Sequence, residues 1–197
     1  MRYLVLLICC VALLFAASPA LADNLLQNPS FSTAGSGGQA AASWLQINGP
    51  TTSLVNSNVL PSAPANPYLV YGPNLIFVTV GTGGGLAQIF LPANSGPTLG
   101  FSEVAVYVVN GTVSIGTGNG GNTGYDGSTG GVTGQWVILS APFGNTPANM
   151  FIIYGTPGAQ FYVAGADVTA TPEPGSVALL GTGLIGLAGL LRRKLVG

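Results

Sequence analysis

Turn-forming residues divide the chain between residues 23 and 171 into short segments. The 197-residue sequence contains 31 glycines and 14 prolines. Proline removes a helix hydrogen-bond donor, and glycine makes a regular element costly in entropy, so the spacing leaves no room for an amphipathic helix of ordinary length. The segments that remain are rich in β-branched and aromatic residues, and several alternate apolar with polar side chains. This pattern predicts strands.

The expected strands lie at residues 52–55, 68–71, 76–80, 86–91, 103–109, 112–115, 135–139, 150–154 and 161–163. Asn110-Gly111 is the preferred pair for a type I′ turn, so residues 103–115 are predicted to form a hairpin. Residues 116–134 contain nine glycines and are expected to form a long surface loop. About ten short strands without a helix predict an all-β fold, a single β-sandwich domain.

The first 22 residues have the features of a signal peptide. Arg2 supplies the charge, residues 4–17 form a short apolar region, and Ala20-Leu21-Ala22 fits the small-x-small rule for cleavage before Asp23. Cys9 and Cys10, the only cysteines, would leave with this segment. Signal peptidase is therefore an expected partner, and the mature chain is expected to contain neither a disulfide nor a thiol nucleophile.

The exported body, residues 23–170, contains four acids and no Lys, Arg or His, which gives a formal charge of −4. Nothing in it can neutralise phosphates, so nucleic acid is not expected as a partner. Anionic membrane surfaces are not expected to attract it either. The four acids are Asp23, Glu103, Asp126 and Asp167.

This inventory leaves little catalytic chemistry. A Ser–His–Asp arrangement and a His-based zinc site are both impossible without histidine. Two carboxylates alone can hydrolyse glycosides, but nothing in the sequence brings two of Glu103, Asp126 and Asp167 together. Asp126 is the only carboxylate of the Gly-rich segment, too few for calcium. We expect no enzyme activity, catalytic residue, metal or cofactor.

Carbohydrate recognition requires aromatic surfaces with amide and hydroxyl groups, and needs no charge. Most aromatic side chains of the body are expected to be half-buried packing residues, because strand aromatics usually face a core or its rim. Tyr125, beside Asp126 in the Gly-rich segment, is the expected exception and the candidate ligand contact. The full set of candidates is Trp44, Tyr68, Tyr71, Tyr107, Tyr125, Trp136, Tyr154 and Tyr162.

The last 27 residues, 171–197, have three parts in order. Pro172-Glu173-Pro174 keeps the backbone extended, because each proline fixes its own φ and restricts the preceding residue. Residues 175–191 carry no charge and would give roughly 25 Å of helix, near the lower limit for spanning a bilayer. Arg192-Arg193-Lys194 then predicts a cytoplasmic end.

This arrangement resembles the PEP-CTERM sorting signal, in which the sorting motif corresponds to Pro172, Glu173 and Pro174. The resemblance implies recognition by a membrane-embedded exosortase, a partner that acts on proteins exported across the inner membrane. The precursor would be anchored by its C-terminal helix, with Arg192, Arg193 and Lys194 as the membrane stop, and would then reach the cell surface or the extracellular space. An ordinary single-pass anchor is the alternative.

The body resembles the galactose-binding-like jelly rolls, the fold of many carbohydrate-binding modules. The similar segments are the opening residues 23–31 with Trp44, the Gly-x-x-Gln-x step at residues 85–89 and the closing residues 161–169. In that family two acids often end the last strand and ligate structural calcium. Only Asp167 is present here, so the resemblance does not extend to a metal.

Three hypotheses about function remain. The sorting resemblance implies a structural or adhesive component linked to exopolysaccharide or biofilm, and this is the leading hypothesis. The alternative is a carbohydrate-binding module-like protein with a specific glycan site, whose partner is a polysaccharide. A minimal glycosidase is the third, and requires that two of the three candidate acids meet in the folded body.

Overall fold

The computed structural model describes residues 23–91, 96–97, 99–119, 122–123, 127–144 and 148–171, together with residues 181 and 183. Among these residues no helix is long and apolar enough to cross a membrane. Several predicted features lie outside the described residues: the signal peptide with Ala20 and Ala22, the candidate contact Tyr125 and Asp126, the motif Pro172, Glu173 and Pro174, most of the apolar run, and Arg192, Arg193 and Lys194.

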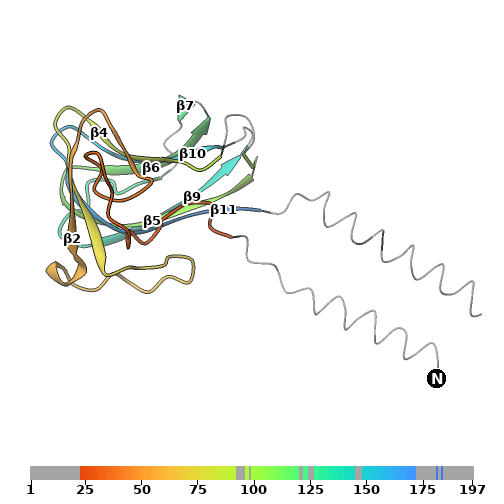
Figure 1. Ribbon diagram of the computed structural model, residues 1–197, viewed down its shortest axis with the longest axis horizontal. Coiled ribbons are helices and arrows are strands. Elements are labelled where there is room, and N and C mark those ends of the chain that lie inside the picture. Colours follow the sequence, from red (N-terminus) through yellow and green to blue (C-terminus); the bar gives the residue numbers. More distant parts are fainter. Residues whose placement is uncertain are drawn as a thin grey trace, which may run out of the picture.

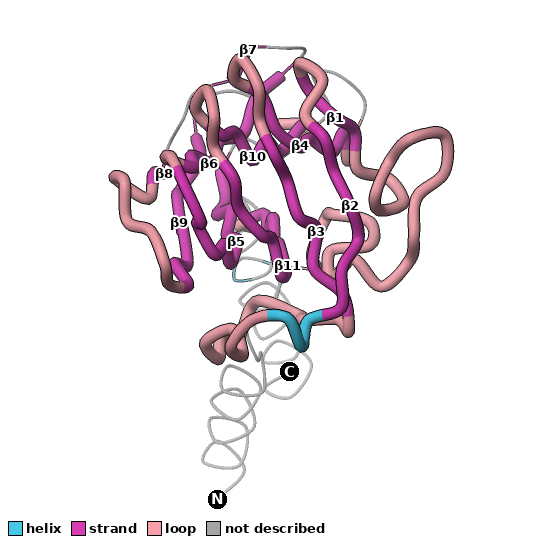
Figure 2. The backbone as a smooth tube through the Cα atoms, turned by 90° about the vertical axis from the view of Figure 1, so that its left-hand side faces the viewer, coloured by secondary structure: helices cyan, strands magenta, loops and turns pink. Residues whose placement is uncertain are grey.

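Two antiparallel sheets pack face to face, which confirms the predicted β-sandwich (Figures 1 and 2). The β10 sheet has the order β1-β4-β10-β6-β7, and β8 also pairs with β6; the β11 sheet has the order β2-β3-β11-β5-β9. The strands are β1 (Leu45–Ile47), β2 (Thr51–Asn56), β3 (Asn74–Thr79), β4 (Gly84–Ile89), β5 (Leu99–Asn110), β6 (Val113–Asn119), β7 (Asn122–Thr123), β8 (Gly127–Ser128), β9 (Trp136–Gly144), β10 (Met150–Gly155) and β11 (Gln160–Ala170).

The core follows from alternation along the strands. On β5, Val104, Val106 and Val108 point into the sandwich and are fully buried. From the other layer, β10 contributes Phe151 and Ile153, which are equally buried. Burial of each such side chain stabilises the fold by about 1.5–3 kcal/mol, so the β-branched and aromatic positions hold the two sheets together.

The segment before β1 closes one side of the core. Phe31 and Trp44 are 0% and 1% exposed, so both side chains belong to the core. The Trp44 ring lies 5.2 Å from Phe31 and 6.3 Å from Phe151, centroid to centroid, and its indole N–H donates to the Asn28 carbonyl over 3.2 Å. A large apolar side chain is thus buried without leaving its polar atom unsatisfied.

Gln88 ties this opening segment to the β10 sheet. Its side chain is 1% exposed, yet its amide nitrogen donates to the Gln27 carbonyl over 2.8 Å and its amide oxygen accepts from the Gln27 backbone N–H. Three residues earlier, a Cβ on Gly85 would lie 1.9 Å from the Ile153 carbonyl oxygen. The Gly-x-x-Gln step therefore allows close strand approach at one position and a buried amide at the other.

The predicted hairpin is wrong. Strands β5 and β6 are found close to the expected positions, but they belong to different sheets and do not pair. Gly111, with φ of +82°, turns the chain across the end of the sandwich, where a Cβ would lie 2.9 Å from the Ala159 Cα. The turn residues determine where the chain reverses, whereas the long-range partners β11 and β10 determine the sheet to which each strand belongs.

Two other expectations fail for a similar reason. Residues 116–119 continue β6 instead of opening a loop, because Gly116 and Gly118 pair with Ile152 and Met150 of β10. The Gly-rich segment also contributes the short strands β7 and β8. Conversely, residues 68–71 form no strand. Backbone pairing with a neighbour can outweigh the entropic cost of glycine, and a β-prone composition is not sufficient without a partner.

Both ends of the body lie at the same end of the sandwich, where the first described residues run beside the last part of β11 (Figure 1). The Leu25 N–H donates to the Val168 carbonyl over 2.8 Å, and the Asn24 side chain bonds both Ala166 and Val168. The Thr171 N–H donates to the Leu99 carbonyl over 3.1 Å. We call this the terminal end of the body.

Candidate functional site

The outer face of the β11 sheet, which points away from the core, carries a row of four aromatic side chains. Phe77 on β3 lies opposite Tyr162 on β11, which lies opposite Tyr107 on β5, which lies opposite Trp136 on β9. Residues paired in this way project on the same side of a sheet. We call these four side chains the aromatic row.

The rings of the aromatic row contact one another in sequence. The centroid distances are 4.6 Å for Phe77–Tyr162, 6.4 Å for Tyr162–Tyr107 and 5.6 Å for Tyr107–Trp136. The last two pairs meet edge to face, the arrangement that the ring quadrupole favours. All four side chains are half-buried, so each leaves part of its ring open to solvent.

A cover segment, residues 57–73, crosses the same face next to the aromatic row. In Figure 1 it runs beneath the layer that contains β5 and β11. It begins with a single 3-10 turn, Ser57–Val59, in which the Asn58 N–H donates to the Asn56 side-chain oxygen. The segment buries a small cluster that includes Ala105 and Ala164. The Tyr71 hydroxyl donates to the Pro64 carbonyl over 2.8 Å, which stiffens the segment.

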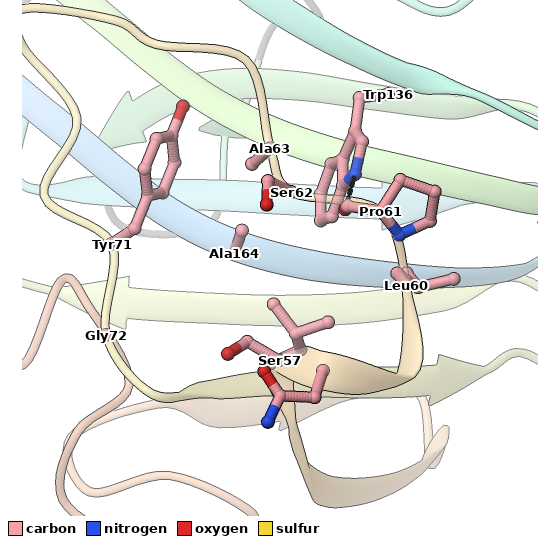
Figure 3. A pocket seen from close by; sticks show the side chains of 11 residues that line it. Ser57, Leu60, Pro61, Ser62, Ala63, Tyr71, Gly72, Trp136 and Ala164 are labelled. Carbon is pink, nitrogen blue, oxygen red and sulfur yellow. Dashed lines mark hydrogen bonds between the residues drawn. The ribbon is translucent and has the colours of Figure 1, made fainter.

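A groove of about 230 Å³ lies where the cover segment meets the aromatic row (Figure 3). Trp136 and Tyr71 stand on either side of Ala164, and Ser57, Asn58 and Ser62 supply hydroxyl and amide groups. The indole N–H of Trp136 donates to the Pro61 carbonyl over 2.7 Å, which fixes the orientation of the ring. Apolar walls with a few convergent polar groups are typical of sites for small uncharged molecules.

Two carboxyl groups meet further along the same face. Asp167 on β11 lies directly opposite Glu103 on β5, and Glu103 lies opposite Ser140 on β9. The sequence contained no signal for this pairing, because register between distant strands is a long-range property. Asn66 of the cover segment donates to the Glu103 carboxylate over 3.2 Å. The body supplies no cationic side chain to compensate either acid.

Burial raises the pKa of Asp167 to about 6; a hydrogen bond with Thr169 opposes this rise, and the negative charge of Glu103 adds to it. Burial and, to a smaller extent, Glu103 also raise the pKa of the Tyr71 hydroxyl. The pair borders a cavity of about 260 Å³ that Tyr68 and Phe101 also line. Asp167 is only 3% exposed and offers little surface to a sugar ring, so the geometry favours a structural pair over a catalytic one.

The remaining candidates do not belong to the aromatic row. Trp44 belongs to the core, Tyr68 is 53% exposed beside the Glu103–Asp167 pair, Tyr71 lines the groove, and Tyr154 lies on β10 in the other sheet. Sequence reasoning did not select Phe77, since only register places it in the aromatic row. Among the described residues no three potential metal ligands of the His, Cys, Asp or Glu type cluster together.

The C-terminal segment matches a known sorting motif. Residues 170–194 match the PEP-CTERM protein-sorting motif. The resemblance of the C-terminal segment is therefore confirmed, and the motif indicates export and membrane-anchored sorting to the cell surface. Among curated proteins no sequence matches this chain.

Among solved structures, the body is similar to carbohydrate-binding modules. One is TmCBM61 in complex with β-1,4-galactotriose, at 17% identity and a TM-score of 0.49 over 76% of this chain and 99% of that one. Another is the CBM22-1 xylan-binding domain of Paenibacillus barcinonensis Xyn10C, at 15% identity and a TM-score of 0.46 over 79% and 100%. A third is a variant of CBM29-2 complexed with cellulohexaose, at 14% identity and a TM-score of 0.47 over 72% and 89%. These similarities concern the fold of the body.

Proposed function

We propose that this is an exported, exosortase-sorted surface protein whose body binds a polysaccharide along the outer face of the β11 sheet. In this proposal residues 1–22 are the signal peptide, residues 23–170 the binding domain and residues 171–197 the sorting segment. Binding would give the protein a structural or adhesive role linked to exopolysaccharide or biofilm. The aromatic row beside the groove is the observation that carries the proposal.

The chemistry of this face suits an uncharged sugar chain. Half-exposed rings can stack on the apolar faces of sugar rings, while Ser57, Asn58 and Ser62 can exchange hydrogen bonds with sugar hydroxyls. The body carries a formal charge of −4 without any cation, so an acidic polysaccharide would be repelled. A neutral polysaccharide is therefore the ligand class that fits.

The aromatic row also indicates the size of the ligand. It crosses four neighbouring strands. At about 4.8 Å between strands, the row extends over roughly 14 Å. A short stretch of a polymer fits this length better than a single sugar. The groove beside Trp136 would hold one ring of the chain, and Tyr107, Tyr162 and Phe77 would continue the contact.

Intrinsic fluorescence and affinity electrophoresis of the full chain in detergent micelles test this proposal. Trp136 is half-buried and Trp44 is 1% exposed, so a ligand at the row should change the emission of Trp136 alone. The panel should include β-1,4-galactan, xylan and β-1,4-glucan, the polymer classes of the similar structures' ligands. Saturable binding that a competing oligosaccharide abolishes is the expected result.

Variants locate the site. Trp136→Ala and Tyr162→Ala should each weaken retardation by the polysaccharide that binds the native chain at least tenfold, because each removes a stacking surface. Val109→Ala is the matched control: Val109 lies on the same strand as Tyr107 and is 45% exposed, but it is outside the aromatic row. If Trp136→Ala and Tyr162→Ala are retarded as strongly as Val109→Ala, the row is not the site. The absence of saturable binding to any polymer would favour a purely structural role.

Sorting is tested by intact mass and C-terminal peptide mapping of the protein recovered from its native host. A chain that starts at Asp23 and ends near Pro174 is expected, and an added glycan mass there would identify attachment. Replacement of Glu173 by Ala is expected to reduce the amount of this product. A mature chain that still ends at Gly197 would mean that residues 171–197 act only as an anchor.

A further inference from the structure

The terminal end of the outer face exposes four apolar side chains close together. Leu99 and Phe101 on β5 are 47% and 48% exposed, and Pro142 lies opposite Phe101 on β9. Tyr68 of the cover segment is 53% exposed and shares a cavity with Phe101. We call Leu99, Phe101, Pro142 and Tyr68 the terminal patch.

The chain beyond Thr171 determines how far this patch can be from a membrane. Five residues, 172–176, separate Thr171 from the uncharged apolar run that begins at Val177. A chain extends at most about 3.5 Å per residue, so Thr171 can lie no more than about 20 Å from the start of this run. The Thr171 N–H is bonded to the Leu99 carbonyl, which places the terminal patch at the attached side of the body.

We propose that the terminal patch rests in the polar-apolar interface of the bilayer while the precursor is anchored. This proposal rests on insertion of the sorting segment and not on the glycan site. Tyrosine and other amphipathic rings are favoured at the interface, and apolar side chains gain by leaving water there. The tether holds the patch within reach, so the contact costs little additional entropy.

The two carboxyl groups that share a cavity with the patch do not prevent this contact. Glu103 is bonded to Asn66, and Asp167 is 3% exposed beneath the cover segment. The described part of the body has no cationic side chain, so the contact would be apolar and would not require anionic lipid. Added salt should consequently have little effect on it.

This orientation would point the aromatic row away from the membrane. Tyr107 and Phe101 lie six residues apart on β5. At about 3.3 Å per residue, the row is roughly 20 Å further along the strand than the patch. The surface proposed to bind polysaccharide would therefore face outward from the bilayer while the terminal patch contacts lipid.

Site-specific fluorescence quenching tests the proposal on the full chain. Cys9→Ser and Cys10→Ser remove both native thiols, after which Leu99→Cys or Tyr68→Cys provides a single labelling site. Val109→Cys is the matched control, at a similarly exposed position toward the other end of β5. Each labelled chain is reconstituted into phosphatidylcholine vesicles that contain a lipid with a nitroxide near the headgroup.

The expected result is several-fold stronger quenching at positions 99 and 68 than at position 109, with no change when phosphatidylglycerol is added. Phe101→Ser, made together with Tyr68→Cys, should reduce the quenching at position 68.

Equal quenching at positions 99 and 109, in chains that resist alkaline extraction, would overturn the proposal. Quenching only with anionic lipid, or protection from an aqueous quencher that disappears on dilution of the protein, would also overturn it. In the last case the patch would be an interface between copies. Extraction of the chain by alkali would overturn both the anchoring and this contact, whereas glycan binding in micelles would be unaffected.

Discussion

The body has two tryptophan-centred aromatic clusters, one inside the sandwich and one outside it. Trp44 packs against Phe31 and Phe151 and is 1% exposed, while Trp136 packs against Tyr107 and remains half-buried. Each indole N–H donates to a backbone carbonyl of a neighbouring loop, that of Asn28 or of Pro61. The same contacts therefore form a buried cluster around Trp44 that stabilises the fold and a partly exposed cluster around Trp136 whose remaining ring surface can contact a ligand.

The largest expected effect is on the inner cluster. Trp44→Ala should lower the free energy of unfolding by about 3–5 kcal/mol, because it leaves a cavity between the two sheets. It should also remove one of the two hydrogen bonds of the Asn28 carbonyl, which still accepts from the Phe31 N–H. Denaturant titration followed by far-UV circular dichroism measures the change. A loss below 1 kcal/mol would mean that the inner and outer clusters do not differ in the way described.

The second prediction concerns the acid pair, which distinguishes the outer face from a core without ionisable groups. The pKa of Asp167 is raised from 3.8 to about 6 in the folded chain, so the folded chain binds a proton at this group more tightly than the unfolded chain does. Stability from this group is present below pH 3.8 and is lost as the pH rises through 6. The loss should be about 2 kcal/mol between pH 4 and pH 7.

Asp167→Asn should flatten this dependence, because the amide does not ionise. The free energy of unfolding at pH 7 should rise by about 1–2 kcal/mol relative to the native chain. Urea titrations at several pH values between 4 and 7 measure both quantities. If the variant and the native chain have parallel pH profiles, Asp167 does not titrate in this range.

The third prediction separates the outer cluster from the inner one. Trp136→Ala should lower the free energy of unfolding by only about 1 kcal/mol, since its ring is half-buried. The same variant should weaken polysaccharide binding at least tenfold if the aromatic row is the site, which is about 1.4 kcal/mol of binding free energy. Isothermal titration with the best-binding polymer gives the second value. A large stability loss with unchanged binding would reverse the assignment.

The smallest effect is expected from Glu103→Gln. Burial raises the pKa of Asp167 more than the negative charge of Glu103 does. Removing that charge should therefore lower the pKa of Asp167 only part of the way toward 3.8. The Asn66 side chain can still donate to the new amide oxygen, and stability should change by less than about 1 kcal/mol. Carboxyl carbon chemical shifts followed against pH report the pKa directly. A pKa of Asp167 that does not move would assign the shift to burial alone.

Short-range information was sufficient to predict the sandwich and the approximate positions of most of its strands. It was not sufficient for the hairpin, because Asn110-Gly111 specifies a reversal but not the pairing partner. The aromatic row needs register among four strands, and Phe77 and Tyr162 lie on strands far apart in the sequence. The Glu103–Asp167 pair depends on the same kind of long-range alignment. A one-residue slip in either register would move these side chains to the opposite face.

The two ends of the body lie side by side, so the sandwich is closed before either flanking segment begins. Among the residues that the structure describes, the strands lie between residues 45 and 170, and the hydrogen bonds of Asn24, Leu25 and Thr171 close the structure at one point. One cleavage before Asp23 and another after Thr171 would remove both flanking segments without breaking the pairing of a described strand. Cleavage at both positions would therefore leave the sandwich intact, with its two new ends side by side at one corner.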